Sequence, residues 1–338
     1  MAQKTLHTAK AQKNDEFYTQ LSDIANELLH YRAQLRGKTI LCSCDDPFES
    51  NFFKYFAGNF NTLGIKKLIA TSYVKSPIVG KQLPLSEIEG LKPEGKGPYV
   101  VEINEIPDMN ADGATGLDDV ELLLKHDKNV TRQLKGDDMY DAGDFRSTEC
   151  VEFLKESDIV ITNPPFSLFR EFVTQLVEHN KQFLIIGNKN SITYKEIFTL
   201  IKENKMRTGY RNINNDMWFE VPEGLAYEKI ENGKKVKHIM AIWLTNLEVA
   251  KHNEMMTLYK KYTPKEYPTY DNYDAIEVAK VAEIPVDYAG AMGVPITFLD
   301  KYNPSQFEII KFRKGKDDRD LSINGKCPYF RILIKPKN

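Results

Sequence analysis

The chain of 338 residues lacks the features that mark secreted, membrane-spanning and disulfide-rich proteins. It holds only four cysteines, too few for a disulfide scaffold in a chain of this length. Its longest apolar stretches, such as HIMAIWL at 238–244, fall far short of the roughly 18 residues that a membrane-spanning helix needs. The first residues, MAQKTLHTAKAQKND, contain no apolar signal core. We therefore expect a cytoplasmic protein with free thiols and no membrane association.

Motifs for metals and for nicotinamide dinucleotides are also missing. Cys42 and Cys44 are separated by one residue, but no second cluster of cysteine or histidine completes a four-ligand zinc site. No G-x-G-x-x-G sequence follows the first expected strand. We therefore expect no metal site, and a nicotinamide-dependent oxidoreductase is disfavoured.

The composition that is present belongs to a folded globular protein, with 41% hydrophobic, 28% charged and 11% aromatic residues. The net charge of −2 hides a segregation of charge along the chain. Residues 97–160 carry sixteen acidic and six basic side chains, whereas residues 301–338 carry ten basic and four acidic ones. A basic C-terminal segment suits a polyanion such as nucleic acid, but a solvated lysine-rich surface explains it equally well.

Hydrophobic periodicity predicts helices and strands in alternation over much of the chain. The expected helices cover residues 15–35, 51–60, 147–156, 167–180 and 192–204. The expected strands cover residues 38–44, 66–74, 158–162 and 182–188. Helices long enough to serve as crossovers between such strands indicate an α/β fold, with a parallel sheet covered on both faces.

Two regions depart from this alternation. Residues 76–143 lose periodicity, and we expect an insertion on the surface of a domain that covers residues 1–250. Two later strands are expected in 216–224 and 238–247, paired through the loop 222–237. Residues 251–338 are rich in proline and tyrosine, poor in helix signals, and end in the strand-like segment CPYFRILIK. This change in composition predicts a separate C-terminal region.

The sharpest chemical signal is Asn163-Pro164-Pro165-Phe166, which follows the apolar strand at 158–162. The carboxyl edge of an open α/β sheet is where such folds bind ligands. An asparagine amide oxygen and a backbone carbonyl can each accept one hydrogen of a planar NH2 group, and so hold the nitrogen lone pair toward an incoming methyl group. Proline fixes φ and adds no competing N–H donor, so the Pro164 carbonyl is held rigidly while Phe166 stacks on the base. The alternative is a Pro-Pro turn with no catalytic part.

The same segment resembles the catalytic motif of adenine-N6 methyltransferases that use S-adenosyl-L-methionine. The segments DEFYTQ, CDDP, NFFKYF, DFRS and TNPPFSLF, spread over residues 14–220, resemble the EcoRI-type adenine-specific DNA methyltransferase family. The resemblance implies a Rossmann-like methyltransferase fold, with a mixed, mostly parallel sheet and helices on both faces. It makes residues 1–250 the catalytic domain and residues 251–338 the region that recognises the DNA target.

The resemblance also implies where the cofactor S-adenosyl-L-methionine binds. An F-x-T element meets its methionine end, an acidic loop follows the first strand, and a later aspartate contacts its adenine; the matching residues are Phe17, Tyr18, Thr19, Asp45, Pro47, Asp144 and Phe145. The chain departs from the usual pattern at two places. The turn DDPFES carries no glycine, and Ser72 or Tyr73 stands where an acid usually grips the ribose hydroxyls. The ribose contact is therefore unassigned.

The function implied by the resemblance is site-specific methylation of adenine N6 in duplex DNA, on a base flipped out of the helix. GAATTC is the first site to test, with the second adenine as target, and a restriction endonuclease is a possible partner in the same system without direct contact. Candidate DNA-binding residues, chosen as polar, basic or aromatic groups outside the motif, are Arg211, Asn214, Trp218, Lys311, Arg313 and Lys314.

Three alternatives stay open at this point. The Asn-Pro-Pro motif also suits an RNA base or a protein glutamine side chain, because both carry a planar NH2 group. A DNA-binding relative without catalytic activity is a further alternative, which the intact motif weakens. For Trp218, packing in the core explains the residue as well as a contact with DNA does.

Overall fold

The computed structural model describes residues 18–47, 50–73, 98–106, 129–221 and 226–337. The predicted cofactor residue Phe17 lies outside these described residues, as does much of the predicted insertion. The chain forms two compact units: unit 1 comprises Met1–Asn188 and Asp216–Ala241, and unit 2 comprises Lys189–Asn215 and Ile242–Asn338. This division differs from the single boundary expected near residue 250, because the chain passes between the units three times.

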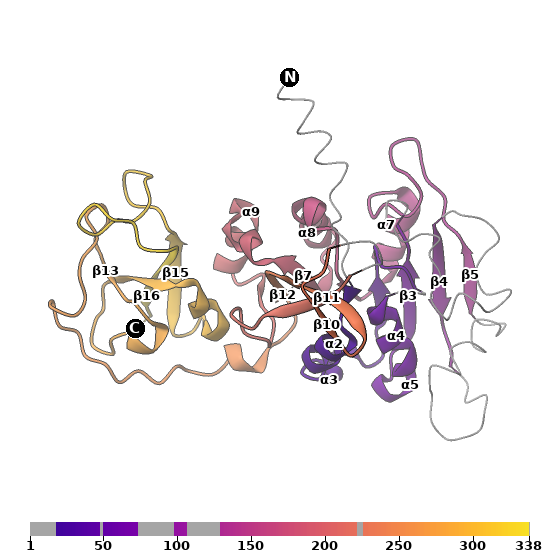
Figure 1. Cartoon of the computed structure of the whole chain (residues 1–338), viewed down its shortest axis with the longest axis horizontal. Helices are drawn as coiled ribbons and strands as arrows, with labels where there is room; N and C mark the ends of the chain where they lie inside the picture. Colours follow the sequence, from indigo (N-terminus) through magenta and orange to yellow (C-terminus); the bar gives the residue numbers. More distant parts are fainter. Residues whose placement is uncertain (1–17, 48–49, 74–97, 107–128, 222–225, 338) are drawn as a thin grey trace. The chain divides into compact units, whose positions relative to one another are not determined.

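A parallel group of four buried strands forms the centre of unit 1 (Figure 1). In spatial order these strands are β3 (Lys67–Thr71), β2 (Thr39–Cys42), β6 (Ile159–Thr162) and β7 (Gln182–Asn188). Neighbouring strands of this group pair in parallel throughout. Every residue of β2 and β6 is buried, which is the continuous apolar pattern expected of strands covered on both faces. The predicted α/β alternation is confirmed for these strands.

Two antiparallel strands extend this sheet beyond β3. Strand β4 (Tyr99–Ile103) pairs with β3, and strand β5 (Val130–Gln133) pairs with β4. Four of the five β4 residues are buried. The prediction that 76–143 is a surface insertion is therefore wrong for β4, because the apolar run YVVEI adds a buried strand to the sheet, whereas the residues of β5 are exposed or half-buried. Figure 1 shows β4 and β5 side by side at this edge.

The α-helices of unit 1 each bury an apolar side chain, and serine side chains cap two of them. The helices are α2 (Leu21–Leu28), α3 (Arg32–Leu35), α4 (Asn51–Gly58), α5 (Phe60–Leu63), α7 (Thr148–Glu156), the 3₁₀ helix η2 (Phe166–Leu168) and α8 (Phe169–Glu178). Ser50 caps α4 by accepting from the N–H of Phe52, and Ser147 caps α7 by accepting from the N–H of Cys150. The single helix predicted over 15–35 is instead the strand β1 (Tyr18–Thr19) followed by α2 and α3.

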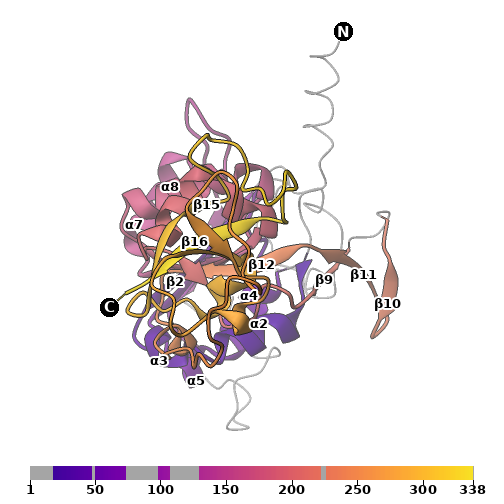
Figure 2. The ribbon, with the colours of Figure 1, turned by 90° about the vertical axis from the view of Figure 1, so that its left-hand side faces the viewer.

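A second, four-stranded sheet of unit 1 has the order β1-β9-β11-β10. It contains β9 (Met217–Glu220), β10 (Lys229–Glu231) and β11 (Lys234–Ile239), all antiparallel to their neighbours. Asn232 and Gly233 have φ of 50° and 78°, which is the backbone that a two-residue hairpin turn needs. The loop predicted at 222–237 therefore contains a hairpin, which extends beyond β9 in Figure 2. The strand predicted at 238–247 is divided at Met240.

Unit 2 combines one helix, short 3₁₀ helices and a four-stranded sheet. The helical segments are η3 (Lys189–Thr193), α9 (Lys195–Lys202), η4 (Ala250–His252), η5 (Val281–Glu283) and η6 (Ile296–Lys301). The sheet has the order β13 (Ala275–Glu277), β14 (Ala291–Pro295), β16 (Arg331–Pro336) and β15 (Phe307–Phe312).

Strand β8 (Arg207–Thr208) of unit 2 pairs antiparallel with β12 (Ala241–Thr245). Tyr270, Ala275, Leu321 and Leu333 form one cluster of the unit 2 core. The predicted scarcity of helix after residue 251 is confirmed for the described residues, as is the strand in CPYFRILIK. None of the helices in the described ranges is long and apolar enough to cross a lipid bilayer.

Candidate active site

The Asn-Pro-Pro-Phe motif lies at the carboxyl end of β6, in the middle of the parallel strands. Pro164 and Pro165 are buried, whereas Asn163 and Phe166 are half-buried. The side-chain oxygen of Asn163 is itself buried. Thr162, just before the motif, donates its hydroxyl to the carbonyl of Ser43 at 2.5 Å. This bond joins the motif to the loop that follows β2.

The loop after β2 makes its turn without glycine. Cys44 has φ of 60°, in the left-handed region that side chains other than glycine rarely adopt. The Asp45 N–H donates to the carbonyl of Thr71 at 3.0 Å, and the Tyr99 hydroxyl donates to Asp46. Strands β3 and β4 thus hold a strained turn in place, and such strain is commonly retained at functional sites. The predicted residues Asp45 and Pro47 lie in this turn, half-buried and buried respectively.

Two buried hydroxyls lie at the ends of β1 and β2. Thr19 is 3% exposed and Ser43 is 5% exposed. Within the described part of the chain, neither hydroxyl oxygen has a hydrogen-bond partner. The backbone carbonyl of Thr19 accepts from the Asn51 side chain at 2.8 Å, which fixes β1 to α4. Because a buried hydroxyl without a partner is costly, each of these hydroxyls fits a place where a polar ligand completes the hydrogen bonding.

The Gly143-Asp144-Phe145 segment packs closely against the end of β3. Gly143 has φ of 78°, and a Cβ there would collide with the carbonyl oxygen of Ser72. Asp144 is 3% exposed and accepts from Arg146 through both carboxylate oxygens, at 2.9 and 2.8 Å. Hydrogen bonding to Asp144 raises the pKa of the Arg146 guanidinium. Oδ1 also accepts the backbone N–H of Arg146 at 2.9 Å, so Oδ2 is the oxygen with a lone pair left to accept from a ligand.

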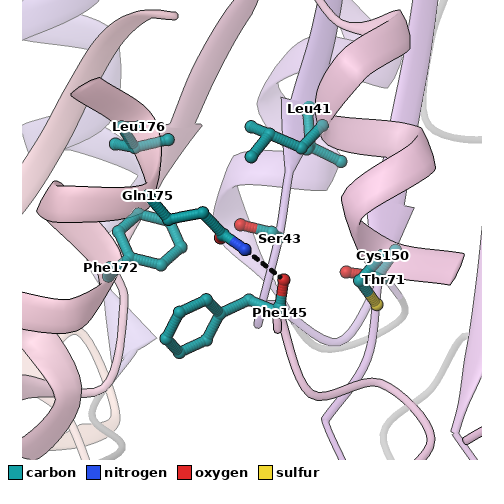
Figure 3. A pocket seen from close by; sticks show the side chains of 9 residues that line it. Leu41, Ser43, Thr71, Phe145, Cys150, Phe172, Gln175 and Leu176 are labelled. Atoms are coloured by element: carbon teal, nitrogen blue, oxygen red, sulfur yellow. Dashed lines mark hydrogen bonds between the residues drawn. The ribbon is translucent and has the colours of Figure 1, made fainter. Parts of the chain in front are cut away.

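A small pocket opens beside Phe145 (Figure 3). Its walls come from the ends of β2 and β3 and from α7 and α8, and they are formed by Leu41, Ser43, Thr71, Phe145, Cys150, Leu154, Phe172, Gln175 and Leu176. Gln175 donates its side-chain N–H to the carbonyl of Phe145 at 3.1 Å, and the Phe145 ring meets Phe172 edge to face at 5.1 Å. Burial raises the pKa of the Cys150 thiol to about 11, so this wall stays neutral at physiological pH.

Among the pocket residues, the sequence predicted only Phe145. The others are isolated apolar or polar positions on strands and helices, which read as core until the tertiary structure brings them together. Ser72 is not available for the unassigned ribose contact, because its hydroxyl accepts from the N–H of Tyr99 at 2.9 Å. Tyr18, half-buried, pairs with Glu220 in β9.

The candidate DNA-binding residues are divided between the two units. In unit 1, Trp218 is half-buried on β9 and not in the core, with the Lys229 ammonium 3.9 Å from its ring centroid and the His238 ring at 5.5 Å. In unit 2, Arg211 is half-buried and Asn214 is exposed, and both lie in the loop after β8.

The basic candidates of unit 2 have partners within that unit. Lys311 donates to the carbonyl of Gly315 at 2.8 Å. Arg313 makes a bidentate pair with Asp320, and Lys314 reaches the same carboxylate at 2.7 Å. These pairs hold the pKa of Asp320 at about 2. Part of the positive charge predicted for this segment is therefore neutralised, and a role in phosphate binding stays a prediction.

Comparison with known proteins gives a consistent set of matches. The model of the family described as "Adenine-specific methyltransferase EcoRI" matches residues 5–337. The chain is 49% identical to the Type II methyltransferase M.EcoRI of Escherichia coli, over 99% of this chain and 97% of that protein. It is 38% identical to the Type II methyltransferase M.MpnI of Mycoplasma pneumoniae, over 97% of both chains. No solved structure matches the chain significantly.

Proposed function

This chain belongs to the EcoRI family of adenine-specific DNA methyltransferases, and we propose that it transfers a methyl group from S-adenosyl-L-methionine to N6 of an adenine flipped out of duplex DNA. One observation carries this proposal. The Asn163-Pro164-Pro165-Phe166 segment follows the central strand β6 directly and is bonded, through Thr162 and Ser43, to the turn after β2. This hydrogen bond would therefore keep the motif that binds the target amine next to the turn that binds the methyl donor.

The motif residues perform separate tasks in this proposal. The Asn163 side-chain oxygen and the Pro164 carbonyl each accept one amino hydrogen of the adenine, which keeps the nitrogen lone pair directed at the methyl group. Pro165 adds no competing N–H, and the Phe166 ring stacks on the base. The bound S-adenosyl-L-methionine supplies an electrophilic methyl group. In the transfer, N6 would form the N–C bond as the S–C bond breaks, the electron pair would stay with sulfur, and the nitrogen would lose one proton to solvent.

Several features of unit 1 support a site for this donor in a Rossmann-like fold. The loops that follow the four parallel strands lie at one edge of the sheet. The turn at Cys44 adopts a left-handed backbone without a glycine, and so would let the backbone approach the donor. The hydroxyls of Thr19 and Ser43 have hydrogen-bonding capacity that the described residues leave unused. Asp144 is buried, and its Oδ2 has a lone pair that could accept from the adenine amino group of the donor. We propose that Tyr18, Thr19, Asp45, Pro47, Asp144 and Phe145 hold the donor, together with Ser43.

We propose that residues 251–338, with the loop after β8, recognise the DNA target. The family relationship makes GAATTC the first site to test and its second adenine the expected target. Action on cellular DNA would place the enzyme in the cytoplasm. A restriction endonuclease that recognises the same site could belong to the same system, and no direct contact between the two proteins would be required.

The test uses the purified full-length chain with radiolabelled S-adenosyl-L-methionine. Label should enter a plasmid that contains GAATTC, and mapping should find it on adenine N6 within that site. A plasmid whose GAATTC sites are each changed at one base pair is the matched control. RNA and protein substrates should remain unlabelled. Label in either of them, or none in any DNA, would overturn the proposal.

A further inference from the structure

An ion pair in unit 2, between the buried Asp300 and the half-buried Lys251, holds the surface loop that follows β8. Asp300, in η6, accepts the backbone N–H of Ile213 through both carboxylate oxygens, at 3.0 Å each. Lys251, in η4, lies 3.9 Å from the Asp300 carboxylate. The same ammonium donates to the carbonyl of Tyr210 at 2.9 Å and reaches the side-chain oxygen of Asn212 at 3.4 Å. The pair therefore holds this loop at three residues, Tyr210, Asn212 and Ile213.

This arrangement is an expensive way to hold a loop. The side chains of Lys251 and Asp300 are 15% and 9% exposed, so the Asp300 carboxylate in particular has lost much of its hydration. Burial raises the pKa of Asp300, and the neighbouring ammonium of Lys251 opposes that rise. Apolar side chains of similar size often stabilise a fold as well as a buried pair does. An ion pair that bonds to two backbone groups and one side chain of the same loop specifies the conformation of that loop.

The loop presents hydrogen-bonding side chains around a buried anchor. Ile213 is 3% exposed, whereas Asn212, Asn214 and Asn215 are exposed. Arg211 lies beside them and is half-buried. Amide and guanidinium groups are the side chains that pair with the edges of adenine and guanine in the major groove. The fixed backbone thus carries groups whose usefulness depends on their exact direction, since base-edge hydrogen bonds are short and directional.

We propose that Lys251 and Asp300 are positioning residues for DNA recognition, which order the loop 210–215 so that its amide side chains meet base edges in a fixed geometry. The inference rests on the proposed function. An ordered loop loses less conformational entropy when DNA binds, and a wrong base is rejected because the loop does not adapt to it. Affinity for DNA and discrimination between sites thus depend on two residues that need not touch DNA.

The kinetic test compares Lys251→Met, Asp300→Asn and the double variant with the unmodified enzyme. The matched control is Lys205→Met, which removes a lysine of the same unit that pairs with Glu203 at the surface. Each single variant should raise the KM for DNA about tenfold and lower the preference for the target over a site with one changed base pair by about tenfold, the scale of one base contact. The kcat should change little, and Lys205→Met should match the unmodified enzyme.

Two further measurements separate positioning from a general loss of structure. Amide hydrogen exchange should accelerate at Ile213 in both single variants, while the affinity for S-adenosyl-L-methionine, measured by calorimetry, stays unchanged. The KM for DNA and the site preference of the double variant should be no further from the unmodified values than those of the more impaired single variant, because both changes release the same loop. Lys251→Arg, which keeps the charge and the donors, should discriminate better than Lys251→Met.

The outcomes distinguish this inference from the proposed function. If exchange at Ile213 accelerates while KM and site preference stay at the unmodified values, the loop does not read DNA. If exchange does not change, the pair does not hold the loop. Either result overturns the inference and leaves the methyltransferase activity standing. If the unmodified chain methylates no DNA, the proposed function fails first and the role of the loop fails with it.

Discussion

The proposed methyl-donor site in unit 1 and the proposed recognition loop in unit 2 differ in how their polar groups are satisfied. At the donor site, the buried hydroxyls of Thr19 and Ser43 make no hydrogen bond within the described residues. At the recognition loop, the buried carboxylate of Asp300 has both oxygens bonded to Ile213 and an ammonium nearby. The donor site thus has buried hydroxyls that can still bond to a ligand, whereas the buried carboxylate at the recognition loop is bonded to the backbone of that loop.

This difference indicates two ways of preparing a protein for a ligand. A buried polar group without a partner marks a place where the ligand completes the hydrogen bonding, so binding energy is concentrated there. A satisfied buried pair marks a scaffold, whose task is to hold other groups in direction. Variants at the first region should therefore change ligand affinity more than stability, and variants of the scaffold should change geometry and stability first.

The largest expected effect comes from Asn163→Ala. Loss of the amide removes one of the two acceptors for the adenine amine, and removal of one such transition-state contact typically lowers kcat by about a hundredfold or more. The affinity for S-adenosyl-L-methionine should stay unchanged. Ser167→Ala, at an exposed position just after the motif, is the matched control. Single-turnover methylation and calorimetry measure the two quantities, and undiminished turnover in Asn163→Ala would remove this residue from the chemistry.

A second variant, Gly143→Ala, tests the packing that sets Asp144 beside β3. The new Cβ would collide with the Ser72 carbonyl, at a residue with φ of 78°. Gly233→Ala is a matched control, because Gly233 has the same φ of 78° but nothing within 4 Å of a Cβ. We expect Gly143→Ala to lose about 1–3 kcal/mol more of the free energy of unfolding than the control does.

The affinity of Gly143→Ala for S-adenosyl-L-methionine should also fall, because the backbone that carries Asp144 must shift. Thermal melting and calorimetry measure both effects. Equal losses in the two glycine variants would show that φ alone matters and that the close approach to Ser72 is unimportant.

The third prediction concerns Thr19→Val and Ser43→Ala, which delete the two buried hydroxyls. Without a ligand, each change should leave the free energy of unfolding unchanged or slightly higher, because an unpaired buried hydroxyl costs about 1–3 kcal/mol. The affinity for S-adenosyl-L-methionine should fall by about tenfold, equivalent to about 1.4 kcal/mol for the lost hydrogen bond.

Thr208→Val is the contrasting control for these hydroxyl deletions. The Thr208 hydroxyl is buried in unit 2 and donates to the carbonyl of Leu299 at 3.2 Å. Its removal should lower stability and leave the donor affinity unchanged. If all three variants changed the free energy of unfolding and the donor affinity in the same way, the two regions would not differ in how their buried hydroxyls contribute to stability and binding.

How far the sequence predicted the fold depended on how local the signal was. The apolar runs of β2, β6 and β7 identified the parallel strands, because each is buried on both faces. Strand β4 was missed although YVVEI is an apolar run, since the surrounding residues have no periodicity. The hairpin β10–β11 was missed because its strands are lysine-rich, although Asn232-Gly233 is a hairpin signal.

The site divides in the same way. Asn163 and Phe166 could be predicted because four neighbouring residues carry the motif, and Asp144 because a short segment resembles the family; their roles stay a prediction. Ser43 and Gln175 were not found, because their place in the pocket depends on strands and helices far apart in the chain. The pair of Lys251 and Asp300 has no sequence signal at all, since only folding brings η4 and η6 to the same loop.

The smallest expected effect tests whether the basic side chains near β15 belong to the scaffold or to the DNA contact. Asp320 pairs with Arg313 and Lys314, and these pairs lower its pKa from 3.8 to about 2. Because the folded-state pKa is depressed, the pairing stabilises the protein above about pH 4 and is lost as the pH falls toward 2. Asp320→Asn should therefore be slightly less stable at neutral pH, and the difference should vanish near pH 2.

The same variant frees two cations, and DNA binding decides their role. If Arg313 and Lys314 contact phosphates, Asp320→Asn should bind DNA a few times more tightly, with a steeper loss of affinity as salt is added. Asp274→Asn, which removes one carboxylate elsewhere in unit 2, controls for net charge. Fluorescence anisotropy over a salt series measures the slope. A slope equal to that of the control would assign both cations to the scaffold, and the recognition surface would then rest on the loop that Lys251 and Asp300 hold.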